Sequence, residues 1–219
     1  MPNEVVNARI IMAMEKLWTS VLVIREFGRR FTTFQSLLLP EEYDKIIAGK
    51  LKGIVPIMSQ EEFHNQMVTL DPGVESERPF VGEAIWSLYY IYRAFTVRQA
   101  LKVQDGLEKK KLQVWNKDFQ GKHDSATERM LGTIFTQEEL LQFDAGDGFG
   151  ATTKIMNAIE VRLLNEMNDW IFNRHFHKID VEKQEAIQNS ITVGGDFNIG
   201  GDFTGDDKAI SNRNIRPLS

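Results

Sequence analysis

Residues 84–95 form the stretch that most constrains how this chain can fold. Its apolar and aromatic side chains would cover nearly every side of a helix: Trp86, Leu88, Tyr89, Tyr90, Ile91, Tyr92 and Phe95. A helix of this kind has to be covered by other elements, so it belongs at the centre of a bundle. We expect this helix to run over residues 82–115. Its second half is rich in lysine (Lys109, Lys110 and Lys111) and is expected to face solvent.

Two further long helices are predicted from apolar residues spaced by three and four. The first covers residues 5–38, and Gly28 weakens its apolar stripe, which predicts a bend or break there. The second covers residues 152–174, and Glu160 is expected to face away from the core. The core-facing stripe of this last helix consists of Met156, Ile159, Leu163, Met167, Trp170 and Ile171.

Several short helices are predicted from their first residues. A hydroxyl residue followed three positions later by glutamate is the capping-box pattern, in which each side chain binds a free backbone N–H. The pattern occurs at Ser59 and Glu62, at Ser125 and Glu128, and at Thr136 and Glu139. We therefore expect helices near residues 60–69, 126–134 and 137–143. Pro40, followed by two glutamates, predicts one more helical start.

The composition limits the class of protein and of partner. Of the 219 residues 42% are hydrophobic and 26% are charged, which is typical of a globular chain. The formal net charge of −5 argues against nucleic acid as the partner. The absence of cysteine excludes disulfides and cysteine-bound metals, and it fits a cytoplasmic protein. The first residues do not form a secretory signal, and residues 17–24 are too short to span a bilayer, so we expect no membrane contact.

These features together predict an all-α fold with three parts. Residues 1–180 are expected to form a helical bundle of three long and several short helices. Residues 181–190 are expected to be a short helix or linker, and residues 191–219 a glycine- and aspartate-rich tail.

The tail differs in pattern from the body. Residues 193–198 and 199–204 repeat one hexad, apolar-Gly-Gly-Asp-Phe-polar, and every odd position from 191 to 203 is apolar or glycine. This period of two is that of a β-strand. Glycines weaken an isolated strand, so β structure in the tail needs a covering surface. The residues expected to make that interaction are Ile191, Val193, Phe197, Ile199 and Phe203.

Three interpretations of the tail remain open. It is a mobile glycine-rich end, or it forms strands on a partner or on another copy, or it folds as a hairpin onto the body. Residues 193–208 (Val-Gly-Gly-Asp-Phe-Asn-Ile-Gly-Gly-Asp-Phe-Thr-Gly-Asp-Asp-Lys) resemble the short Gly-Asp-rich tails of some bacterial signalling and conflict proteins. That resemblance implies a homotypic, amyloid-like assembly motif.

The body offers few candidates for chemistry. The glycine-rich segment 144–150 lacks the Gly-Lys-Ser/Thr ending of a P-loop, so we interpret it as a connection between helices. His175 and His177 would share a face only on an extended segment, and we expect no metal there. Arg93 interrupts the most apolar helix, so we expect it to pair with a carboxylate or an aromatic face, with ligand recognition as the alternative. We predict no catalytic residue and no cofactor.

The sequence therefore favours a non-enzymatic interaction or signalling protein. Its helical body would be joined to a tail that mediates self-association or binds a protein partner. The alternative is an enzyme or effector with a polar site embedded in the bundle. A closed polar cavity among the long helices, holding paired carboxylates or histidines, would favour the enzyme.

Overall fold

The computed structural model describes the backbone of residues 2–50, 53–56, 58–70, 72–118, 120–145 and 149–193, and side chains within these ranges from residue 5 to residue 172. Regular structure in these ranges is helical throughout, apart from an isolated β-bridge between Lys117 and His123. The predicted all-α fold is thus confirmed. The chain divides into two units, residues 1–173 and residues 174–219.

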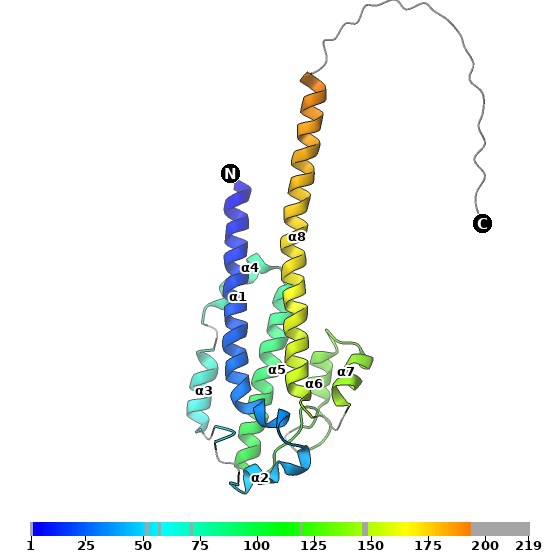
Figure 1. Ribbon diagram of the computed structural model, residues 1–219. Coiled ribbons are helices and arrows are strands. Elements are labelled where there is room, and N and C mark those ends of the chain that lie inside the picture. The colour runs from blue at the N-terminus through cyan, green and yellow to red at the C-terminus, as the bar shows by residue number, and fades with distance from the viewer. Residues whose placement is uncertain are drawn as a thin grey trace, which may run out of the picture. The chain divides into compact units, whose positions relative to one another are not determined.

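Three long helices frame the bundle: α1 (Pro2–Thr32), α5 (Glu83–Glu108) and α8 (Ala151–Val193) (Figure 1). The shorter elements are η1 (Thr33–Ser36), η2 (Pro40–Glu42), α2 (Asp44–Ile47), α3 (Gln60–Val68), η3 (Val74–Glu77), α4 (Arg78–Val81), α6 (Ser125–Leu131) and α7 (Gln137–Asp144). Over the described part of the chain, every helix is too short or too polar to cross a membrane.

Helix α5 is the central element, as predicted from its apolar sequence. Tyr92 and Phe95 on α5 are fully buried, together with Leu17 on α1 and Ile159 and Leu163 on α8. The predicted stripe of α8 is buried at its first four members. Trp170 is partly buried, whereas Ile171 is 36% exposed. The burial of these side chains provides the main driving force for packing the three helices.

The predicted break near Gly28 is wrong, because α1 continues through it to Thr32. A Cβ atom on residue 28 would lie 2.3 Å from Cγ2 of Thr96 on α5. The glycine therefore allows α1 and α5 to approach each other closely.

The predicted end of the central helix near residue 115 is also wrong. Helix α5 ends at Glu108, and Lys110 has a left-handed φ of 54°. The Lys111 N–H donates to the Gly106 carbonyl at 2.7 Å, and the Lys110 N–H donates to the Leu107 carbonyl at 3.3 Å. These two bonds define a Schellman motif, which stops a helix by satisfying its last carbonyl groups. The lysine run thus terminates α5 rather than extending it.

Two of the three predicted capping boxes are confirmed, at Ser59 before α3 and at Thr136 before α7. The third is wrong by one residue. Asp124, and not Ser125, caps α6, and its carboxylate accepts a hydrogen bond from the Thr127 N–H. Aspartate is as good an N-cap as serine, and Asp124 is held in place by further partners.

Helix α8 ends at Val193, well beyond the predicted end near residue 174. It includes the predicted linker 181–190 and the first residues of the tail. In the single chain the backbone at Ile191 and Val193 is helical, whereas the strand predicted for the tail depends on a covering surface. An established helix gains one hydrogen bond for each added residue, which favours its continuation beyond residue 174. Residues 194–219 lie outside the described residues.

Candidate functional site

A buried hydrogen-bonded group joins the three long helices. The Tyr92 hydroxyl donates to Oε1 of Glu160 at 2.6 Å, and an Arg25 nitrogen donates to Oε2 at 3.2 Å. Glu160 is only 7% exposed, so the prediction that it faces away from the core is wrong. Burial, and then the bond to Glu160, raises the pKa of the Tyr92 hydroxyl far above its ordinary value. Tyr92 is consequently a fixed donor that helps to register α5 against α8.

A second buried group attaches the segment after α5 to the helix itself. Asp124 accepts hydrogen bonds from Arg98 at 2.9 and 3.0 Å and forms an ion pair with Lys102 at 2.6 Å. Lys102 also donates to the Trp115 carbonyl at 2.7 Å. Both Lys102 and Asp124 are almost completely buried. These charges are paired within the fold, which gives them a structural role.

A third group fixes the short helices η3 and α4 to the N-terminal half of α1. The carboxylate of Glu77, 4% exposed, pairs with Arg9 at 2.5 Å and with Lys16 at 2.9 Å. The hydrogen bond from Lys16 is the main cause that lowers the pKa of Glu77. Arg9 also stacks on the ring of Phe80, 4.1 Å from its centre. Glu77 thus fixes the segment from which Glu75 and Arg78 line a surface pocket.

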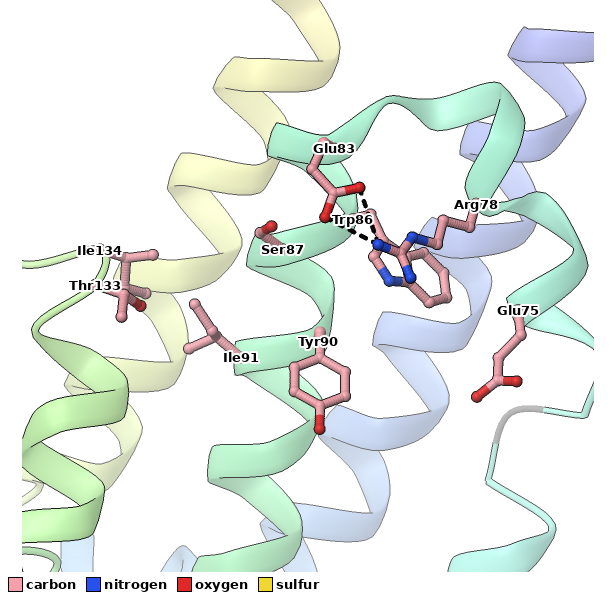
Figure 2. Close-up of a pocket in the computed structure, with 9 residues that line it drawn as sticks. All are labelled: Glu75, Arg78, Glu83, Trp86, Ser87, Tyr90, Ile91, Thr133 and Ile134. Atoms are coloured by element: carbon pink, nitrogen blue, oxygen red, sulfur yellow. Dashed lines mark hydrogen bonds and ion pairs between the residues drawn. The ribbon is translucent and has the colours of Figure 1, made fainter.

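That pocket has a volume of about 770 Å³ and opens beside the N-terminal half of α5 (Figure 2). Glu75 and Arg78 form its wall on η3 and α4, and the turn after α6 forms the opposite wall with Thr133 and Ile134. The residues that α5 contributes are Glu83, Trp86, Ser87, Tyr90 and Ile91. Pockets of this size are typical of sites that hold a small molecule or part of a partner protein.

The polar groups of the pocket are arranged around an aromatic surface. Arg78 donates to both carboxylate oxygens of Glu83, at 3.0 and 3.1 Å, and its guanidinium lies 5.8 Å from the ring centre of Trp86. Tyr90 is 60% exposed although it belongs to the most apolar helix of the protein. In Figure 2 its ring stands between Ile91 on one side and Glu75 on the other. The pocket therefore offers the exposed ring of Tyr90, beside the largely buried Trp86 and an ion-paired arginine.

A second hollow of about 480 Å³ adjoins the first and shares Ser87, Thr133 and Ile134 with it. It extends toward α8, where Arg162, Asn165 and Glu166 line it. Arg162 donates to the Ile134 carbonyl and to Glu139, and its guanidinium lies 4.5 Å from the ring centre of Phe135. We refer to these two adjoining hollows together as the groove across α5.

The residues predicted to carry the interaction do not contribute to this groove among the described residues. Ile191 and Val193 belong to the last turn of α8. Phe197, Ile199 and Phe203 lie outside the described residues. Arg93 lies half-buried on α5 and does not line the pocket.

We expected no metal at His175 and His177, because their side chains would share a face only on an extended segment. The backbone of both residues is helical, and their side chains lie outside the described ones. Among the side chains that the structure describes, no group of three histidine, aspartate or glutamate residues is arranged to hold a metal ion.

Sequence reasoning assigned Tyr90 to the core and so missed the pocket. The signal that could have found it is a polar stripe on the apolar helix. Glu83, Ser87 and Tyr90 recur at intervals of four and three, which places them on one face. A face of this kind on a central helix is expected to reach the surface.

Comparison with known protein families, with curated proteins and with solved structures finds no match to this chain.

Proposed function

We propose that this chain is a protein-interaction protein, in which the helical body binds a protein partner and the glycine- and aspartate-rich tail mediates self-association. The single observation that carries the body's role is the exposed Tyr90 beside Trp86 and Arg78. Tryptophan, tyrosine and arginine are the residue types that contribute most to binding at protein interfaces. The ion pair between Arg78 and Glu83 holds the arginine in place before a partner arrives.

The buried charges support an interaction role over an enzymatic one. A polar site embedded in the bundle would need acids or bases that are available to a substrate. Among the described residues, Glu77, Asp124 and Glu160 are the buried carboxylates, and each is engaged by protein side chains. The pocket beside α5 pairs its arginine with Glu83 and otherwise presents aromatic, aliphatic and hydroxyl groups together with the single exposed carboxylate of Glu75.

The tail's part in this proposal rests on its pattern of period two. With α8 ending at Val193, the apolar residues that remain for strand formation are Phe197, Ile199 and Phe203. Burying each of these side chains would contribute about 1.5–3 kcal/mol. This contribution can offset the entropy lost in ordering the glycines, but only when another surface covers the side chains. A second copy supplies such a surface. The absence of cysteine suits a cytoplasmic location for this assembly.

Sedimentation velocity over a range of protein concentrations tests the tail's role. The full chain should associate as concentration rises, and a chain ending at Val193, which keeps all of α8, should not. The double variant Phe197→Ser/Phe203→Ser should behave like the shortened chain. Its matched control is Asn198→Ser/Thr204→Ser, which changes only the polar positions of the hexads and should still associate. Identical sedimentation of the full and shortened chains would refute self-association through the tail.

A further inference from the structure

The groove across α5 has an apolar floor with a carboxylate toward each end. The floor consists of Trp86, Leu88, Tyr90, Ile91 and Ile134. Glu75 lies in the hollow beside α4, and Glu166 lies in the hollow beside α8. Glu75 and Glu166 are both exposed, and each lacks an ion-pair partner among the described residues.

The two arginines of the groove are already occupied. Arg78 binds both oxygens of Glu83, and Arg162 binds Glu139 and the Ile134 carbonyl. Each guanidinium is thus already ion-paired with a carboxylate of this chain, which reduces its attraction for an anionic ligand. The charges without an ion-pair partner among the described lining residues are therefore the two carboxylates, so the groove is complementary to positive charge.

We infer that this groove binds a basic segment of a partner protein in which lysine or arginine residues are interspersed with aliphatic ones. The aliphatic side chains of the segment would lie on Trp86 and Tyr90, and its cations would meet Glu75 and Glu166. A cation can also stack on the exposed ring of Tyr90. This inference rests on the proposed function and specifies the partner of the body, independently of the tail.

Fluorescence anisotropy with the full chain and a labelled peptide of alternating leucine and arginine tests the inference. The peptide should bind, and added salt should weaken the binding because exposed charges are screened. Glu75→Gln and Glu166→Gln should each weaken binding by about two- to fivefold, as expected for single exposed ion pairs. Tyr90→Ala should weaken it by about tenfold or more, as expected for an interface aromatic residue. Tyr90 is 60% exposed, so this variant should keep its thermal unfolding temperature.

Two controls distinguish the groove from general acidity. Glu138→Gln changes an exposed carboxylate on α7 that does not line the groove, and it should leave binding unchanged. A peptide with glutamate in place of arginine should not bind. Binding of the acidic peptide, or binding of the basic peptide that is insensitive to all three groove variants, would overturn the inference.

The two proposals fail separately. If the basic peptide binds the full chain and the chain ending at Val193 alike, the groove acts without the tail. If the full chain associates through its tail while the peptide does not bind, only the groove assignment is wrong. If the shortened chain still associates and Tyr90→Ala abolishes that association, a second copy occupies the groove, and the assignment to another partner is overturned.

Discussion

Gly28 on α1 and Thr96 on α5 lie in direct contact, because a Cβ atom on residue 28 would stand 2.3 Å from the Thr96 methyl carbon. Met156 of α8 reaches the same point, with its Cε 3.3 Å from that position. Gly28 of α1 therefore lies where side chains of both α5 and α8 pack against α1. Substitutions at Gly28 and Thr96 test this contact between α1 and α5.

Gly28→Ala is expected to destabilise the protein although alanine favours a helix more than glycine does. The added methyl group overpacks the contact at a cost of about 1–3 kcal/mol, and the gain in helix propensity is about 1 kcal/mol. The net loss in the free energy of unfolding should be up to about 2 kcal/mol, measured by urea denaturation. Thr96→Ser removes the opposing methyl group, so the double variant should recover most of the loss. A double variant no better than Gly28→Ala would contradict the contact.

Tyr92→Phe is expected to cost about 1–2 kcal/mol, because it removes the buried donor to Glu160 while Arg25 keeps the carboxylate paired. Glu160→Ala should cost more, since it leaves the Tyr92 hydroxyl buried without its acceptor. Urea denaturation of both single variants and of the double variant gives the coupling energy between the two residues. Strictly additive effects would mean that the 2.6 Å bond contributes nothing to stability.

The features that could be predicted from the sequence are those that depend on residues close together along the chain. The caps at Ser59 and Thr136 are complete within four positions, so their pattern identifies them. The role of Gly28 depends on its contact with Thr96, and the burial of Glu160 depends on its bond to Tyr92. These residues are far apart in the sequence, so no spacing pattern predicts that they meet. Helical periodicity therefore predicted the long helices. It did not predict the roles of residues such as Gly28 and Glu160, which lie at the contacts between helices.

The candidate site shows the same limit. Periodicity places Glu83, Ser87 and Tyr90 on one face of α5, and this much was available in the sequence. The other walls of the groove come from α4, from the turn after α6 and from α8. Their meeting around Tyr90 depends on tertiary packing, for which the sequence carries no local signal.

Lowering the pH is expected to reduce the free energy of unfolding, because Asp124 then becomes protonated. Burial raises the pKa of this carboxyl, but the bonds from Arg98, Lys102 and Thr127 outweigh it and hold the pKa well below the ordinary value. A carboxyl with a lowered folded pKa stabilises fully above its unfolded pKa, about 3.9, and this contribution is lost as pH falls toward the folded pKa. Below about pH 4 the loss should approach 1.4 kcal/mol per pH unit.

Asp124→Asn isolates this contribution. The variant leaves Lys102 buried without its counterion, so it should cost about 3–5 kcal/mol near pH 7. The difference between wild type and variant, measured by urea denaturation, should shrink between about pH 5 and pH 2. Asp169→Asn, at an exposed position of α8, reports the effect of losing any one carboxyl. A difference that stays constant with pH would rule out Asp124 as the source.

Lys110→Gly is expected to stabilise the protein by about 0.5–1 kcal/mol. Lys110 has a φ of 54°, in the left-handed region where a Cβ atom costs about 1–2 kcal/mol and glycine costs nothing. Part of that gain is offset because glycine makes the unfolded chain more flexible, by about 0.4–1 kcal/mol. The Schellman bonds from the N–H groups of residues 110 and 111 are kept. Lys110→Ala retains the Cβ atom and serves as the control, so thermal unfolding should show a gain of about 1–4 °C for glycine and none for alanine. Equal gains in the two variants would instead implicate the lysine charge.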